Sequence, residues 1–285
     1  FKGKSYKIQS MQDAIDAKPA IAIFSAGGST SLEWAPKFAA NKTFVIDNSS
    51  AWRMHENTPL VVPEVNADAI TQNDFIIANP NCSTIQMVVA LKPLHVKYHL
   101  KRIVVSTYQS VTGTGQKAVK QMMDERTGNA VDAVYPYQID MNILPHIDIF
   151  LEDGYTKEEQ KMMLETKKIM NLPDLKITAT TVRVPTMGGH SESINATFDL
   201  PIDLAEIRNI LSHSEGIILQ DDPSKLLYPM PLTAHDKDEV FVGRLRIDNS
   251  CDNTLNMWVV SDNLRKGAAT NAVQIAEYLV EKGLL

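Results

Sequence analysis

Long apolar runs, clusters of basic residues and regularly spaced cysteines are all missing from this chain of 285 residues. Its longest apolar stretches, such as 75–78 and 87–91, are far shorter than the about 20 residues of a membrane-spanning helix. The formal net charge is -6, and no block of Lys and Arg forms the footprint of a nucleic-acid-binding surface. No charged-then-apolar leader opens the chain. We therefore expect a cytoplasmic protein that contacts neither membranes nor nucleic acids.

Cysteine is scarce, since Cys82 and Cys251 are the only two. Two cysteines cannot build a disulfide framework, so a reducing compartment is expected. Cys251 lies in a polar turn, and we interpret it as a surface residue without a role. His95 and His99 have a ligand-like spacing but no accompanying acidic or third ligand, so we predict no metal site.

The first part of the chain alternates short apolar strands with helices. Such alternation predicts a parallel sheet that is covered on both faces. The expected strands are 20–26, 43–50 and 74–80, with helices after the first and the third and an extended segment at 59–66. We find no strand, glycine turn and helix ahead of residue 20, where a further unit of this kind would stand.

The rest of the chain favours a mixed, mostly antiparallel sheet with helices, an α+β layer. Thr156 and Glu159 form a capping box at the start of a clear helix, 156–170. Further helices are expected at 115–126 and over the amphipathic C-terminal segment 264–285. The strands that we expect are 101–111, 175–185, 193–201, 240–248 and 255–262. The length and the 44% hydrophobic content fit two domains with a substantial core.

Cys82 stands at the start of the helix that follows the third strand. Pro80 biases Asn79 toward an extended conformation, and Asn81 is a favoured N-cap residue. Cys82 then lies in the first helical turn, where free N–H groups stabilise an anion and lower a thiol pKa. The sequence therefore predicts a reactive nucleophile in the crevice at the carboxyl end of a sheet. The alternative, a small buried hydrophobe, stays open on this pattern alone.

Three further patterns suit a bound ligand, and only the first is moderately specific. His190 follows the bend at Gly188 and Gly189, and Arg183 lies on the preceding strand, where a guanidinium can hold a carboxylate or phosphate. Taken singly, each is more often structural. The segment 113–118 has the form G-x-G-x-x-A but lacks the acidic partner of a dinucleotide fingerprint, so we interpret it as a turn close to a ligand. The glycines of 25–30 open a helix that suits an anion.

Several blocks together resemble one family. They include SAGGSTS, VIDNSSAWRM, NPNCSTIQ, VVSTYQSVTGTG, NILPHID, GYTKEEQKMMLETKKI, TTVRVPTMGGHSESI, FVGRLRID and WVVSDNLRKGAATNAVQIAEYL. From about residue 20 to the end, these blocks occur in the order seen in aspartate-semialdehyde dehydrogenases. The resemblance implies a Rossmann-like nucleotide-binding domain, 1–81 with 262–285, and a catalytic and dimerisation domain, 82–261. It also implies that the family's N-terminal glycine-rich unit is missing here.

The resemblance implies NADPH-dependent reduction of L-4-aspartyl phosphate to L-aspartate 4-semialdehyde with release of phosphate, on the route to lysine, methionine and threonine. Cys82 matches the nucleophile that forms a thioester, His190 matches the acid/base and Gln109 the residue that orients the intermediate. The residues that match the substrate and phosphate sites are Arg53, Asn81, Glu158, Lys161 and Arg183. The positions that match the NADP(H) site are Ser25, Ala26, Gly27, Gly28, Asn48, Ser50, Gly113, Gly267 and Asn271.

The family likeness also implies a homodimer, with a dimer of dimers as a further option. The sequence leaves two alternative functions open. The first is an N-acetyl-glutamyl-phosphate reductase, against which the charged Glu158 argues because an acetylated nitrogen has no charge to pair. The second is an inactive, truncated remnant that only dimerises.

Overall fold

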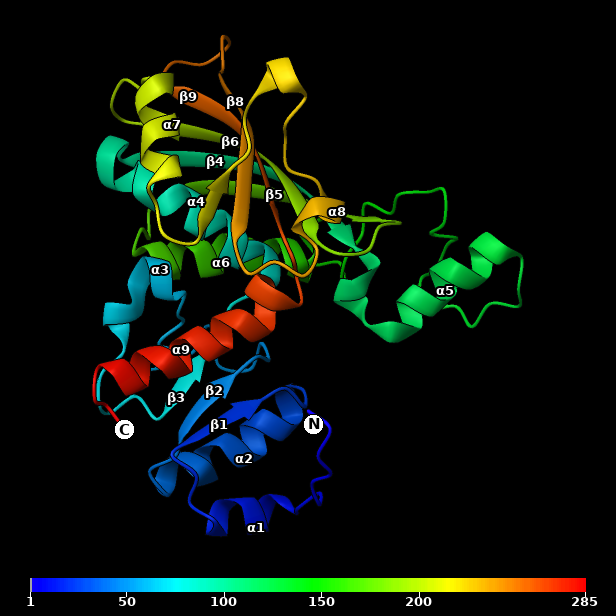
Figure 1. Ribbon diagram of the computed structural model, residues 1–285, viewed down its shortest axis with the longest axis vertical. Helices are drawn as coiled ribbons and strands as arrows, with labels where there is room; N and C mark the ends of the chain where they lie inside the picture. The colour runs from blue at the N-terminus through cyan, green and yellow to red at the C-terminus, as the bar shows by residue number, and fades with distance from the viewer. Residues whose placement is uncertain (1) are drawn as a thin grey trace.

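The computed structural model describes residues 2–285 and contains two sheets (Figure 1). The smaller sheet has three parallel strands in the order β1-β2-β3, as the short apolar strands predicted. They are β1 Ile21–Phe24, β2 Phe44–Asp47 and β3 Ile76–Ala78. The helices of this part are α1 Met11–Asp16, α2 Gly28–Ala40 and α3 Pro63–Asn66.

The larger sheet has six strands in the order β5-β4-β6-β9-β8-β7. The pairs β4–β5 and β7–β8 are parallel and the other three are antiparallel, so the mixed, mostly antiparallel sheet is confirmed. The strands are β4 Leu100–Ser110, β5 Lys176–Val184, β6 His190–Phe198, β7 Ile217–Leu219, β8 Val240–Ile247 and β9 Thr254–Ser261. The remaining helices are α4 Cys82–Tyr98, α5 Gln116–Thr127, α6 Lys157–Met170, α7 Leu204–Ser212, α8 Pro231–Ala234 and α9 Thr270–Glu281.

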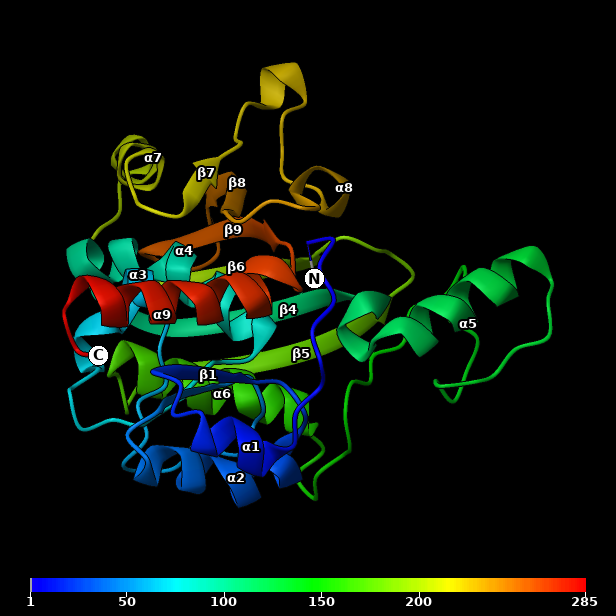
Figure 2. The same cartoon turned by 60° about the horizontal axis from the view of Figure 1, so that its bottom comes forward.

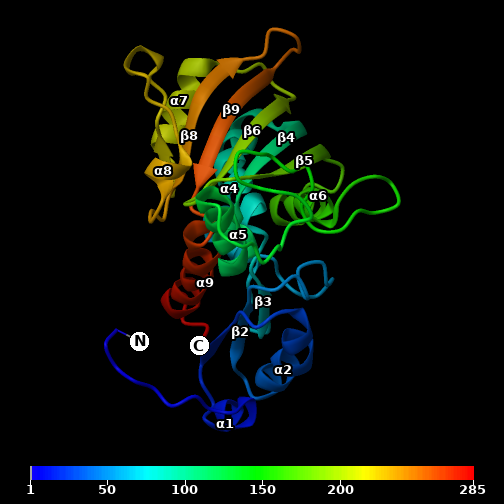
Figure 3. The same cartoon turned by 90° about the vertical axis from the view of Figure 1, so that its right-hand side faces the viewer.

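Both sheets bury apolar side chains against helices. In the small sheet, Phe44 and Ile46 pack against Ile275 and Leu279 of the returning helix α9. Phe24 and Val45 face the other way and pack on α2. In the large sheet, one face carries α4, α6 and α7, which share a single apolar core with the inward strand residues (Figure 3). The domain boundaries at 81 and 262 stay a prediction, and α9 brings the C-terminal segment onto the small sheet.

One local expectation was incomplete, and two helices were missed. The segment 59–66 is not wholly extended, because Pro63 opens the short helix α3, where proline's fixed φ and missing N–H suit the first turn. Helices α1 and α7 were not predicted, although Ser10 and Asp203 cap them. Among residues 2–285, no helix combines the length and the apolarity needed to cross a bilayer.

The segment 111–144, which includes α5, extends away from the body in both views (Figures 1 and 2). We call it the α5 arm. It leaves β4 through a 3-10 turn at Val111–Thr114 and returns to pair at Leu144 with Arg183. A small separate core that includes Ala118, Met122 and Ile139 stabilises it.

Candidate active site

Cys82 is the first residue of α4, as the sequence predicted. Asn81 is its N-cap, and its side-chain oxygen accepts hydrogen bonds from the backbone N–H groups of Ser83 at 3.0 Å and Thr84 at 3.3 Å. Gly267 lies directly against the cysteine, since a Cβ at that position would be 2.9 Å from the Cys82 Cβ. Cys82 therefore lies where the start of α4 meets the π-turn Arg265–Ala269 ahead of α9.

The expected lowering of the cysteine pKa is wrong for this state of the protein. Burial of the thiol, followed by the nearby Glu158 carboxylate, raises the pKa of Cys82 to about 12. Arg183, Arg53 and the Ser83 N–H lower the pKa by less. The residue keeps partial solvent access, but its sulfur is held protonated at neutral pH.

Strand register brings three predicted residues into one row. Arg183 on β5 is paired with Gln109 on β4. His190, the first residue of β6, follows one step beyond the pair Tyr108–Ser191 on the neighbouring strand. All three side chains are buried, with exposed fractions of 5%, 2% and 0% for Arg183, Gln109 and His190. The row lies at the end of the sheet. Its other two members, Arg183 and His190, follow Gln109 by 74 and 81 positions in the chain.

His190 is a neutral imidazole with a defined tautomer. Its Nδ1 accepts a hydrogen bond from the backbone N–H of Ser110 at 3.0 Å, so the ring proton resides on Nε2. Nε2 is buried and has no hydrogen-bond partner among residues 2–285. Burial, followed by the charge of Arg183, lowers the pKa of His190 to about 3. The ring therefore offers one free N–H donor.

Glu158 joins several of the predicted residues. Its Oε1 accepts from the Asn81 amide at 2.8 Å and from the Gln109 amide at 3.3 Å. Its Oε2 accepts from Lys161 Nζ at 3.3 Å, and Lys161 also donates to Asp148 at 2.7 Å. Burial alone would lower the pKa of Lys161, but the two carboxylates together raise it. The ammonium stays charged and half-buried beside Glu158.

Glu165 contacts two of the predicted residues, although the sequence did not single it out. It accepts from Arg53 Nη1 at 3.1 Å and from the Asn81 N–H at 2.7 Å. Burial raises the pKa of Glu165 by more than Arg53 and Asn81 lower it. Helical spacing could have revealed it, because Glu158, Lys161 and Glu165 follow one face of α6.

The predicted cofactor residues form two groups. Ser25, Ala26 and Gly27 are exposed between β1 and α2, and Gly27 caps α2 at φ +90° without any side-chain cap. The first N–H groups of this 13-residue helix are therefore open to an anion, which fits a nucleotide phosphate. Ser50 is exposed, and the next residue, Ala51, lies 3.8 Å from a Cβ placed at Gly28.

The second group lies nearer Cys82. Asn48 accepts from Asn79 at 2.8 Å, and Asn271 donates to Asn79 at 2.6 Å. This asparagine chain joins the ends of β2 and β3 to α9, and Asn79 was not predicted. Gly113 faces the row of predicted residues, since a Cβ there would lie 3.0 Å from Arg183 Nη1 and 3.1 Å from the His190 ring. Gly267 contacts Cys82 as described.

Comparisons with known proteins place this geometry in a family. Residues 1–73 match the family model described as semialdehyde dehydrogenase, NAD binding domain, and residues 91–266 match the one described as semialdehyde dehydrogenase, dimerisation domain. The first match indicates a pyridine-nucleotide cofactor. An aspartate-semialdehyde dehydrogenase of Aquifex aeolicus is 54% identical over 296 residues, which cover 100% of this chain and 86% of that protein.

Solved structures agree. A crystal structure of aspartate semialdehyde dehydrogenase II from Vibrio cholerae, complexed with ASA, matches with a TM-score of 0.88 and 46% identity over 92% of this chain and 79% of that one. The Candida albicans enzyme with NADP matches with a TM-score of 0.75 and 25% identity over 93% and 78%. The chain is an oxidoreductase that belongs to the aspartate-semialdehyde dehydrogenase family.

Proposed function

We propose that this enzyme interconverts L-4-aspartyl phosphate and L-aspartate 4-semialdehyde, with NADP(H) as the cofactor and phosphate as the co-product. The observation that carries the proposal is the row Arg183, Gln109 and His190 at the end of the sheet, together with Cys82 at the start of α4. Two polar atoms of this row, Arg183 Nε and His190 Nε2, are buried without a partner among the residues that the structure describes. Buried polar groups are normally satisfied, so both atoms favour a bound substrate.

Substrate recognition uses opposite charges. Arg183 Nη1 donates to the Ser110 carbonyl at 2.7 Å, which holds the guanidinium while Nε stays available for the substrate carboxylate. Glu158 offers a buried carboxylate to the substrate ammonium. Arg53 and Lys161 are the cations for the phosphoryl group, and both are already held near Asn81 through Glu165 and Glu158.

The chemistry starts at the Cys82 sulfur. It attacks the acyl carbon, the C–S bond forms, and the C–O bond to phosphate breaks. Because burial keeps the thiol protonated, its proton leaves during the attack, and the departing phosphate is a suitable acceptor. The nicotinamide supplies a hydride to the resulting thioester when the cofactor is bound.

His190 acts as a donor in its observed tautomer. Its Nε2–H stabilises the oxygen on which negative charge develops as the thioester is reduced. Accepting a proton at Nε2 would require the ring proton to move to Nδ1, which would break the bond from the Ser110 N–H. When the C–S bond breaks, the oxygen forms the C=O of the aldehyde, the aldehyde leaves, and the Cys82 thiolate takes a proton from water to restore the thiol. A thiol that must stay reduced suits the cytoplasm, where we place the reaction.

Preference for NADP over NAD is part of the proposal and is supported by the Candida albicans relative with NADP. The open N-terminus of α2 holds a nucleotide phosphate, and Gly113 and Gly267 leave room beside the catalytic row. Neither alternative function is favoured, because the relatives compared are aspartate-semialdehyde dehydrogenases.

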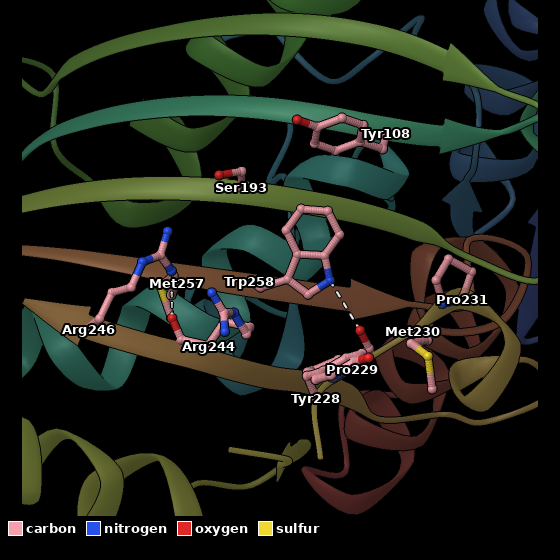
Figure 4. Close-up of a pocket in the computed structure, with 10 residues that line it drawn as sticks. All are labelled: Tyr108, Ser193, Tyr228, Pro229, Met230, Pro231, Arg244, Arg246, Met257 and Trp258. Atoms are coloured by element: carbon pink, nitrogen blue, oxygen red, sulfur yellow. Dashed lines mark hydrogen bonds between the residues drawn. The ribbon is translucent and has the colours of Figure 1, made fainter. Parts of the chain in front are cut away.

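We also propose that the chain forms a homodimer through the outer face of the large sheet. This face, opposite α4, carries Tyr108 and Trp258 with ring centroids 5.4 Å apart, beside Arg244 and Arg246 (Figure 4). A hollow of about 580 Å³ lies over them. The family's dimerisation-domain match spans this entire face. Sedimentation of the wild type and of Trp258→Ala tests it and separates a dimer from a dimer of dimers.

The decisive test is formation of NADPH from L-aspartate 4-semialdehyde with and without phosphate. Cys82→Ala should abolish it, and Cys251→Ala, which removes the exposed second thiol, should leave it unchanged. NAD replaces NADP in a parallel series. A folded wild type that produces no NADPH or NADH in the presence of phosphate would refute the proposed function.

A further inference from the structure

The α5 arm surrounds Arg183, although most of it lies away from the body. The backbone of Leu144, where the arm returns, exchanges two hydrogen bonds with Arg183, at 3.0 Å from the Leu144 N–H and 2.8 Å from the Arg183 N–H. Where the arm starts, Gly113 is so close that a Cβ would lie 3.0 Å from Nη1. Both ends of the arm therefore contact the residue that we assign to the substrate carboxylate.

A third contact comes from Tyr135, in the irregular part of the arm. Its ring lies over the guanidinium, with the Arg183 Cζ 6.0 Å from the ring centroid, at the outer edge of the range for a cation–π contact. Tyr135 is half-buried, and hydrogen bonds hold both its hydroxyl and its backbone. The Tyr135 hydroxyl donates to Thr114 at 2.8 Å, and the Tyr135 N–H donates to the buried Gln121 at 2.9 Å.

Gln121 ties this loop to α5. Its side-chain oxygen also accepts from the Val134 N–H at 2.7 Å, and it is only 2% exposed. One turn farther along α5, Glu125 accepts from the N–H groups of Ile139 and Asp140 at 2.9 and 2.8 Å. The loop that carries Tyr135 is thus fixed to α5 by two side chains, and the ring has a defined place.

Among the described residues, the guanidinium of Arg183 makes only one hydrogen bond, from Nη1 to the Ser110 carbonyl. A single bond leaves the plane of the fork free to rotate, whereas a two-point grip on a carboxylate requires a fixed plane. An aromatic ring over one face restricts that rotation and keeps water from that face. We propose that Tyr135 is a positioning residue, which sets the plane of Arg183 so that its free edge meets the substrate carboxylate.

This inference rests on the proposed function, and its test separates the two. The variants are Tyr135→Met, which removes the aromatic face, and Tyr135→Phe, which keeps the face and removes the hydroxyl. The control is Tyr155→Met, because Tyr155 is also half-buried and also bonds a threonine hydroxyl, Thr178 at 2.8 Å, but away from Arg183.

Steady-state kinetics with L-aspartate 4-semialdehyde gives the first readout. Tyr135→Met should raise KM about three- to tenfold with kcat within about twofold of the wild type, as expected for loss of one cation–π contact. Tyr135→Phe and Tyr155→Met should keep the wild-type KM. Equal KM values in the wild type and in Tyr135→Met, or an equal rise in Tyr135→Phe, would overturn the proposal.

A second readout depends on the carboxylate alone. L-2-Aminobutyrate carries the amino and carboxylate groups of the substrate without the aldehyde, and propylamine lacks the carboxylate. Protection of Cys82 from alkylation by L-2-aminobutyrate should need a higher concentration in Tyr135→Met, whereas any protection by propylamine should not change. A shift that is equal for both compounds would show a general structural effect and overturn the role. A wild type without activity would refute the proposed function instead.

Discussion

Replacing Gly267 by alanine should damage both stability and catalysis, because the new methyl group would meet Cys82, the proposed nucleophile. The added Cβ would lie 2.9 Å from the Cys82 Cβ and 3.4 Å from its Cα. Non-bonded carbon atoms are most stable about 3.5–4.0 Å apart, so one side must move by roughly 0.6–1 Å. The nearest atoms belong to the first residue of a capped helix and cannot swing away as a flexible side chain could.

Overpacking of this kind costs typically about 1–3 kcal/mol of unfolding free energy. Catalysis should also suffer, since a misplacement of about 1 Å at a reacting group can lower the rate by about 10²-fold. We expect Gly267→Ala to lose about 1–3 kcal/mol in urea unfolding and to lose about 10- to 100-fold in kcat. KM for the semialdehyde should change less, because Arg183 and Glu158 are untouched.

Gly28→Ala provides the packing control. A Cβ at Gly28 has a single neighbour, Ala51 Cβ at 3.8 Å, which is an ordinary contact. Its unfolding free energy should stay within about 0.5 kcal/mol of the wild type. Because Gly28 belongs to the proposed cofactor loop, only its stability is compared. Wild-type stability together with wild-type kcat in Gly267→Ala would refute the argument from close packing.

Two further predictions concern buried charges. Lys266 is fully buried and donates to both Glu64 oxygens, at 2.8 and 2.7 Å. Lys266→Met leaves the Glu64 carboxylate unpaired and should lower the unfolding free energy in urea by about 3–5 kcal/mol. The double variant with Glu64→Leu should recover part of that loss. Glu192 is fully buried, and burial raises its pKa. The native state then keeps a proton that the unfolded chain loses above about pH 4.3, so the stability of the wild type falls as the pH rises. In unfolding titrations, the stability of Glu192→Gln relative to the wild type should therefore increase from pH 5 to pH 8. A constant difference across this range would contradict a protonated Glu192.

Local signals in the sequence predicted the local structure around several candidate site residues. Pro80 and Asn81 correctly placed Cys82 at the start of a helix, because a cap depends on a few adjacent residues. The capping box of Thr156 and Glu159 was equally local, and both of its hydrogen bonds are present. The apolar spacing of the last helix predicted its buried face, although only the fold shows that the face packs on β2.

The residues that were missed depend on long-range pairing. Glu165 acquires its role because α6 lies beside the loop that carries Arg53, which is 112 positions away. Tyr135 meets Arg183 only because the α5 arm turns back at Leu144. Neither the register that aligns Gln109 with Arg183 nor the fold of the arm is encoded in a short window, so propensity and spacing could not reveal these contacts.

The Cys82 pKa shows how a correct local rule can be overruled. A helix N-terminus stabilises an adjacent anion by about 0.3–1 kcal/mol, which is less than one pKa unit. Burial can raise a pKa by up to about 3–5 units, and Glu158 acts in the same direction. The magnitudes decide in favour of burial, so without substrate the thiol stays protonated.

The rate of alkylation at Cys82 reports whether the thiol is protonated. At pH 7.5 iodoacetamide should modify the exposed Cys251 well before Cys82, as read by peptide mass spectrometry over time. Glu158→Gln removes the carboxylate that raises the thiol pKa and should speed up the modification of Cys82, whereas the rate at Cys251 should not change. Faster modification of Cys82 than of Cys251 in the wild type would restore the helix cap as the dominant influence. The slow outcome would mean that the nucleophile is activated by the arrival of its substrate, which protects the thiol between turnovers.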